Sequence, residues 1–161
     1  MSLIIRAATL TDNQGMRDVL NPIIRAGGTT ANEVEHSEAQ MAEMIDSFAP
    51  PEFCNVAEED GRILGWQCIY MHTKLPPEIG DISSFVAIEA KGKGVGKALI
   101  AETLQMARLN GFTAINATIR ADNFGGLAFY TAMGFRDHSV TRAKPLKSGK
   151  KVDRISKRLT L

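Results

Sequence analysis

An alternation of glycine and lysine near the middle of the chain has the clearest chemical meaning. It reads KGKGVGK over residues 91–97 and lies between an apolar run and a run with helical spacing. Backbone N–H groups in such a turn, with the partial positive charge of a helix N-terminus, form an anion site suited to phosphate. A Cβ on any of the glycines would hold the phosphate away, and the lysines add positive charge. A glycine-rich surface turn is the alternative at this point.

Two familiar phosphate-binding loops do not match this stretch. A Walker loop requires Ser or Thr after its lysine, whereas Ala98 follows Lys97. The dinucleotide fingerprint requires another spacing of its third glycine, and it opens a strand–helix–strand unit that the preceding chain lacks. The loop alone therefore predicts an anionic ligand without naming it.

The composition is that of a soluble globular protein, and it argues against several other functions. The net charge is +1 over 161 residues, and no apolar run is long enough to cross a membrane. Residues 142–161 hold eight Lys or Arg and one acidic residue, but no aromatic residue lies among them, so we expect no nucleic-acid binding. The N-terminus lacks the features of a secretory signal, so we expect a cytoplasmic protein with no membrane partner.

The cysteines and histidines show no metal-ligand spacing, so we expect no metal. Cys54 and Cys68 lie in strand-like runs. Without an export signal, we expect both to be buried thiols rather than a disulfide.

Hydrophobic periodicity predicts the elements that must position the loop. Strands are expected at residues 3–7, 53–58, 62–71, 79–88, 112–119 and 152–159, with another beginning at Phe135. Helices are expected from Thr11 or Asp12, after a capping box at 37–40, at 95–109 and from Asn123. We expect Pro22 to kink or restart the first helix. This order predicts a mixed α/β fold, with residues 1–161 as one domain.

Two segments together resemble the signatures of the GNAT N-acetyltransferases. Residues 91–96 resemble the family's Gln/Arg-x-x-Gly-x-Gly/Ala loop, with Lys91 where the family more often has Arg or Gln. Downstream, Asn123 is followed by Tyr130 and then by Gly134-Phe135, as in the second signature. The resemblance implies a single GNAT-like α/β domain. Its central, mostly antiparallel sheet would be flanked by about four helices, and a splayed strand pair would bind the cofactor.

The resemblance also implies acetyl-CoA as the acetyl donor. In this family the loop holds the pyrophosphate, and the strand before it offers backbone groups to the pantetheine arm. The cofactor-binding residues implied for this sequence are Phe85, Val86, Ala87, Ile88, Lys91, Gly92, Lys93, Gly94, Val95, Gly96, Lys97, Asn123 and Tyr130.

Acetyl transfer to an amine requires a group that takes the amine's proton and a donor to the departing thiolate. The resemblance places Tyr130 near the thioester sulfur as the general acid, and a core aromatic is the alternative. Asp81, near the start of a strand, is the candidate base, and a solvated strand-end aspartate is the alternative. His72 is a weaker candidate, and His36 and His138 are more simply structural or exposed.

Other segments are similar to the phosphinothricin-type acetyltransferases, which acetylate α-amino groups of small amino-acid analogues such as methionine sulfone. The similar segments are residues 21–31, 81–86 and 147–153, although 81–86 departs from that branch on the acceptor side and Lys151 stands where the branch commonly has Trp. The candidate acceptor-binding residues are Arg25, Thr29, Thr30, Asp81 and Ser83. For the first three, an exposed helix end and a loop are the alternative.

The resemblance therefore implies an acetyl-CoA-dependent N-acetyltransferase that acts on the primary amine of a small molecule, such as an amino-acid analogue. The amine would attack directly in a ternary complex. A protein or peptide N-acetyltransferase and a non-catalytic acyl-CoA-binding module are the alternatives. Relatives are often dimers, so a homodimer is expected by analogy.

Overall fold

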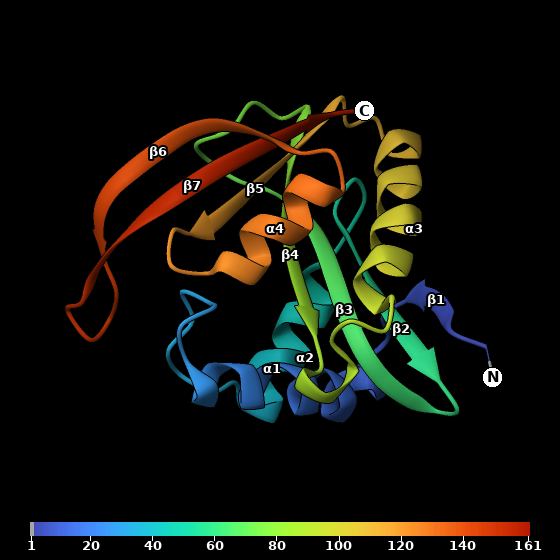
Figure 1. Cartoon of the computed structure of the whole chain (residues 1–161). Coiled ribbons are helices and arrows are strands. Elements are labelled where there is room, and N and C mark those ends of the chain that lie inside the picture. Colours follow the sequence, from blue (N-terminus) through green and yellow to red (C-terminus); the bar gives the residue numbers. More distant parts are fainter. Residues whose placement is uncertain (1) are drawn as a thin grey trace.

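The computed structural model describes residues 2–161 and contains one seven-stranded sheet with four α-helices. The strands are β1 (Ile4–Ala7), β2 (Phe53–Glu59), β3 (Arg62–Met71), β4 (Ile79–Val86), β5 (Ala114–Arg120), β6 (Arg136–Pro145) and β7 (Lys151–Thr160). The helices are α1 (Asn13–Ala26), α2 (Glu38–Ser47), α3 (Val95–Leu109) and α4 (Phe124–Ala132), with 3₁₀ turns at Leu10–Asp12 and Ile88–Ala90. The mixed, mostly antiparallel α/β fold expected from the sequence is confirmed (Figure 1).

The strand order is β1-β2-β3-β4-β5-β7-β6, and every neighbouring pair is antiparallel except β4 and β5. Those two strands pair only through Ile79↔Ala114, Gly80↔Ile115 and Asp81↔Asn116. Beyond this point they diverge, and Figure 1 shows the gap that opens between them. One edge of β4 is therefore left without a strand partner beyond Asp81.

Helices cover both faces of the sheet, because the neighbouring β3 residues Gly65 and Trp66 face α3 and α1 respectively. Both α1 and α3 pack on β3, and α2 packs beside α1. The helical spacing correctly predicted the apolar face of α1, which buries Met16, Val19, Leu20, Ile23 and Ile24. Of the kink or restart predicted at Pro22, the restart does not occur, because α1 continues through Pro22 to Ala26. Proline removes one backbone donor, and burial of the residues beside it holds the last turn in place.

Two smaller sequence predictions are confirmed. Asp60 and Gly61 have φ of 51° and 77°, the left-handed conformation that a tight two-residue hairpin between β2 and β3 requires. Cys54 and Cys68 lie opposite each other on these strands as buried free thiols. The strand predicted to reach residue 88 ends at Val86, where the chain turns into the 3₁₀ segment.

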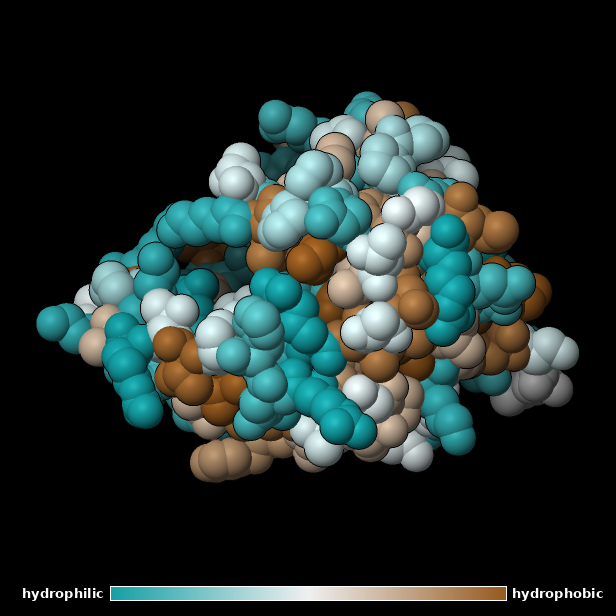
Figure 2. Space-filling model, turned by 90° about the horizontal axis from the view of Figure 1, so that it is seen from above, coloured by the Kyte–Doolittle hydropathy of each residue, from teal (hydrophilic) through white to brown (hydrophobic). Residues whose placement is uncertain are grey.

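The β6–β7 hairpin forms one end of the molecule, and Figure 2 shows that end, on the left, as largely hydrophilic. All ten residues of β6 are exposed. Among residues 2–161, no helix has the length and apolar character needed to cross a bilayer.

Candidate active site

The glycine loop joins β4 to α3 and forms one wall of a cavity of about 480 Å³. Gly92 and Gly94 have φ of 76° and 83°, and a Cβ built on either would meet no atom within 4 Å. Their side of the loop is therefore open space beside the backbone. A Cβ on Gly96 would instead lie 2.9 Å from the Phe129 ring, so this glycine allows α3 to approach α4.

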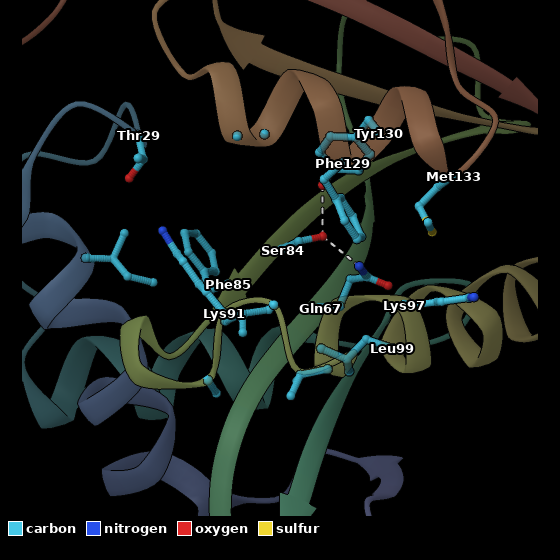
Figure 3. Close-up of a pocket in the computed structure, with 18 of the residues that line it drawn as sticks. Thr29, Gln67, Ser84, Phe85, Lys91, Lys97, Leu99, Phe129, Tyr130 and Met133 are labelled. Carbon is cyan, nitrogen blue, oxygen red and sulfur yellow. Dashed lines mark hydrogen bonds between the residues drawn. The ribbon is translucent and has the colours of Figure 1, made fainter.

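Most of the residues that the sequence implied for the cofactor line this cavity. They are Phe85, Val86, Lys91, Gly92, Gly94, Val95, Gly96, Lys97, Asn123 and Tyr130. Figure 3 shows Lys91 and Lys97 beside the cavity with Tyr130 and Phe129 of α4 above it. Three implied residues do not line the cavity: Ala87 is buried, and Ile88 on the 3₁₀ turn and Lys93 are exposed.

The free edge of β4 offers backbone groups to the gap, but not those the sequence suggested. The Ala87 N–H donates to the carbonyl of Leu64, a residue of β3, at 2.8 Å. Alternate residues of an antiparallel strand face the same partner, so the backbone groups of Phe85 also face β3. Those of Ser84 and Val86 face the gap. The backbone groups on the free edge of β4 are therefore those of Ser84 and Val86, whereas those of Phe85 and Ala87, which the sequence suggested, face β3.

Tyr130 is buried on α4, and its hydroxyl donates a hydrogen bond to Ser84 Oγ at 2.8 Å. Gln67 Nε2, from β3, donates to the same oxygen at 2.6 Å, and Figure 3 shows both bonds. Gln67 is completely buried, and its Oε1 has no hydrogen-bond partner among the described residues. Burial raises the pKa of Tyr130 above its usual value, which keeps the phenol protonated.

Ser84 and Gln67 were missed by the sequence reasoning. Gln67 had a visible signal, because it is a polar residue within the apolar run of β3, where a buried amide needs a partner. No sequence signal distinguished Ser84, because its neighbour Ser83 has the same side chain.

A second cavity of about 350 Å³ meets the first at the gap. Thr29, Thr30, Asp81 and Ser83, four of the five candidate acceptor residues, line it. Arg25 lines neither cavity, because its exposed side chain pairs with Glu35 at 3.1 Å, and we remove it from the candidate site. Sequence reasoning missed the lining residues Tyr70, Thr118, Arg120 and Arg154, which the sheet register brings to this cavity.

Asp81 is 8% exposed, so its interpretation as a solvated strand-end residue is wrong. The parallel pairing with β5 covers it, and its Oδ1 accepts a hydrogen bond from Asn116 Nδ2 at 3.0 Å. Burial raises the pKa of Asp81 above its usual value, and the Asn116 hydrogen bond opposes part of that rise. A buried carboxyl with a raised pKa, in a cavity, has the character of a general base.

Of the three histidines, only His72 lines one of these cavities. Its Nδ1 accepts a hydrogen bond from the Lys74 N–H at 3.1 Å. His36 lies in the loop before α2, where its backbone N–H donates to Asn21, and His138 is exposed on β6.

Asn123 borders both cavities and ties their walls together. Its Oδ1 accepts from the Gly126 N–H at 3.0 Å, which caps α4. Its Nδ2 donates to the Thr29 carbonyl at 3.0 Å, and Arg120 donates to the Thr30 carbonyl at 3.0 Å. These bonds hold the loop between α1 and α2 over the second cavity, so Asn123 positions the walls of the site.

Comparison with known proteins gives a family match. The model of the acetyltransferase (GNAT) family matches residues 20–135. An L-2,4-diaminobutyric acid acetyltransferase of Nocardia farcinica is 32% identical over 91 residues, which cover 56% of this chain and 47% of that protein. A mycothiol acetyltransferase of Paenarthrobacter aurescens is 33% identical over 101 residues, which cover 61% of this chain and 31% of that protein. The matched region is thus less than half of each of these relatives.

Solved structures share the fold over nearly the whole chain. The yncA protein of Salmonella typhimurium, solved with its cofactor acetyl-CoA, has a TM-score of 0.91 at 19% identity and covers 100% of this chain and 95% of its own. A phosphinothricin acetyltransferase of Sinorhizobium meliloti, solved in complex with acetyl-CoA, has a TM-score of 0.89 at 24% identity, covering 100% of this chain and 89% of its own.

Proposed function

Because this chain belongs to the GNAT acetyltransferase family, we propose that it is an acetyl-CoA-dependent N-acetyltransferase whose acceptor is the primary amine of a small molecule. One observation carries the proposal. The loop-walled cavity and the Asp81 cavity share Thr29, Thr30, Ser84, Phe85, Asn123 and Tyr130 as lining residues. Two substrates entering from opposite faces of the sheet would therefore meet at the gap between β4 and β5, beside Tyr130.

The residues present fit acetyl-CoA, which supplies the acetyl group as a thioester. The open side of Gly92 and Gly94, with Lys91 and Lys97 close by, suits a pyrophosphate at the start of α3. The backbone groups of Ser84 and Val86 suit the amides of an extended arm lying along the free edge of β4. The same edge offers a backbone N–H to the oxyanion that develops when the thioester is attacked.

Asp81 is the proposed base. A carboxylate in the acceptor cavity can accept the proton that the amine must lose as its nitrogen bonds the acetyl carbon and the carbon–sulfur bond breaks. The raised pKa of Asp81 brings its proton affinity closer to that of an amine than an exposed aspartate would have.

Tyr130 is the proposed donor to the leaving thiolate. Its pKa is raised above the usual value of 10.0, whereas an ordinary thiol titrates near about 8.5. Full proton transfer from the phenol to the sulfur is therefore uphill. Tyr130 serves best as a hydrogen-bond donor that stabilises the thiolate while it leaves, rather than as an acid that loses its proton completely.

Within the family, the phosphinothricin-type branch is our proposal for the nearest functional group. Thr29, Thr30, Asp81 and Ser83, all from segments similar to that branch, line the acceptor cavity. The curated relatives named for diaminobutyric acid and mycothiol also support a small-molecule acceptor. The loop over the cavity, tied down through Thr29 and Thr30, favours a compact acceptor over an extended peptide.

The test has two parts, binding and turnover. Acetyl-CoA should raise the Tm of the purified chain, because a ligand that binds only the folded state stabilises it. Thiol release should then be measured with methionine sulfone, L-2,4-diaminobutyrate, polyamines and short peptides. Turnover with at least one small amine is expected. No change in Tm with acetyl-CoA or CoA would contradict the donor, and turnover with peptides alone would contradict the acceptor class.

A further inference from the structure

Arg154 lies on the wall of the second cavity and has no role in the fold that the structure reveals. It stands on β7 opposite Arg120 of β5 and lines the cavity together with Asp81, Ser84 and Tyr130. Its Nε is buried without a hydrogen-bond partner, and its guanidinium takes part in none of the ion pairs formed within residues 2–161. A buried donor that is left unpaired destabilises the fold, so this position is unfavourable without a ligand.

Two other arginines on this face of the sheet, Arg120 and Arg158, are already engaged. Arg120 forms a two-pronged pair with Asp122, at 2.9 and 2.7 Å, and donates its remaining nitrogen to the Thr30 carbonyl. Arg158, farther along β7, donates to Asn116 Oδ1 at 2.9 Å. Among the described residues that line the cavity, Arg154 is thus the cation whose charge and donors have no partner in the protein.

The negative charge in the cavity is separated from this guanidinium. Asp81 is the one acidic residue among the described lining residues, and it bonds to Asn116, four positions before Arg120 along β5. At about 3.3 Å per residue, four positions span about 13 Å of strand. Asp81 and Arg154 therefore leave the sheet at positions about 13 Å apart along β5, and they form no ion pair with each other. Ser84 and Tyr130, at the gap, also line this cavity.

We propose that Arg154 binds a carboxylate of the acceptor, so that the substrate is an amine that also carries a carboxylate. This inference rests on the proposed acetyltransferase function and narrows its substrate class. A carboxylate accepts two parallel hydrogen bonds from a guanidinium, which would satisfy Nε and the charge together. The amine of the same molecule would then be directed toward the gap. A polyamine would instead place a second cation beside Arg154, and the repulsion between the two positive charges disfavours a polyamine as the acceptor.

The unmodified enzyme provides the first test through matched acceptors. L-2,4-diaminobutyrate and 1,3-diaminopropane have the same amines on the same carbon chain and differ only in the carboxylate. Methionine sulfone and its carboxamide form a second pair. We expect kcat/KM to be at least about 10-fold higher for the carboxylate member of each pair that is turned over. Equal values, or a preference for the member that lacks the carboxylate, would overturn the inference.

Variants then locate the effect. Arg154→Gln should raise KM for the carboxylate acceptor by about 10-fold or more and leave KM for the decarboxylated acceptor and for acetyl-CoA within about twofold. Arg154→Lys should give an intermediate KM, because lysine keeps the positive charge but cannot donate two parallel hydrogen bonds to a carboxylate. Arg136→Gln is the matched control, since it removes the same charge from an exposed position on β6 that lines neither cavity.

The outcomes separate this inference from the proposed function. If acetyl-CoA raises the Tm and amines are acetylated, but Arg154→Gln affects both members of a pair equally, the carboxylate contact is refuted while the acetyltransferase stands. If acetyl-CoA causes no shift and no amine is turned over, the proposed function fails, and this inference fails with it. The Tm of each variant, measured alone, shows whether a loss reflects the fold.

Discussion

The Tyr130 hydroxyl of α4 donates a hydrogen bond to Ser84 Oγ of β4. Because Gln67 Nε2 donates to the same oxygen, both lone pairs of the Ser84 hydroxyl are in use. The Ser84 hydroxyl hydrogen is therefore free to be donated to another acceptor. For Tyr130 to donate to a leaving sulfur, it must exchange this bond for the new one, and both residues line both cavities where that exchange would take place.

Tyr130→Phe tests the donor role directly. The phenylalanine keeps the edge contacts with Phe129 and Phe135, at 5.1 Å between ring centroids, and loses only the hydroxyl. We expect kcat to fall by about 10²-fold, the usual scale for removing one group that assists proton transfer or stabilises charge, with KM for acetyl-CoA within about twofold. Thiol-release kinetics measure both quantities.

Ser84→Ala is the companion variant, because it keeps the phenol and removes its resting acceptor. A smaller loss of kcat than in Tyr130→Phe supports the phenol as the group that acts on the sulfur. If Tyr130→Phe turns over at the normal rate, the phenol has no part in the reaction.

The parts of the site that could be predicted from sequence are those whose chemistry is local in the chain. The glycine loop and Tyr130 lie in short segments whose residue types and spacing are enough to predict their role. Ser84, Gln67 and Arg154 come together only through the register of β3, β4, β5 and β7, which no local pattern encodes.

One alternative, for Asp81, and one assignment, for Arg25, fail for the same reason. Asp81 was open to interpretation as a solvated residue because its cover, Asn116, is 35 positions away and reaches it through the one parallel pair of the sheet. Arg25 was placed at the acceptor site from its position near Thr29. The last turn of α1 instead directs it outward to Glu35. Distance along the chain is a poor guide where a helix end decides which way a side chain faces.

Asp81→Asn should separate activity from stability. The amide can still accept the hydrogen bond from Asn116 but cannot take a proton, so kcat should fall by about 10²-fold. In the unmodified enzyme, kcat should decline as pH falls through the raised pKa of Asp81, above the usual range for aspartate. The variant should lose that decline, and a pH profile of kcat that is unchanged in shape would contradict Asp81 as the base.

The sign of the stability effect follows from the same pKa. Because the folded-state pKa is raised above the unfolded value, the folded state binds more protons between the two, and stability falls as pH rises through this window. Asp81→Asn removes that penalty. Its free energy of unfolding, relative to the unmodified chain, should therefore be higher at about pH 8 than at about pH 3.5 in urea titrations. A relative stability that decreases with pH would show that Asp81 is stabilised as an anion.

The three lysines of the glycine loop should not be equivalent. Lys91 and Lys97 line the loop-walled cavity, whereas the exposed Lys93 does not. We expect Lys91→Gln and Lys97→Gln each to raise KM for acetyl-CoA by about 3- to 10-fold at low salt and by less at high salt, because salt screens exposed charge pairs. Lys93→Gln has the same charge change and serves as the control. An equal rise in KM for acetyl-CoA in all three variants would indicate that the loop acts through its total charge rather than through contacts of Lys91 and Lys97 with the cofactor.

Gly94→Ala and Gly149→Ala form a matched pair that separates backbone strain from loss of the anion site. Both glycines have positive φ, 83° and 90°, and a Cβ on either meets no atom within 4 Å. Each alanine should therefore lower the free energy of unfolding by about 1–2 kcal/mol, since an L-residue is strained in this conformation.

Of the two glycines, only Gly94 lines the loop-walled cavity, so only the methyl group of Gly94→Ala would occupy the space assigned to pyrophosphate. In calorimetric titrations, Gly94→Ala should weaken acetyl-CoA binding at least about 10-fold while Gly149→Ala leaves it unchanged. Equal affinities in the two variants would show that the pyrophosphate does not bind against this side of the loop.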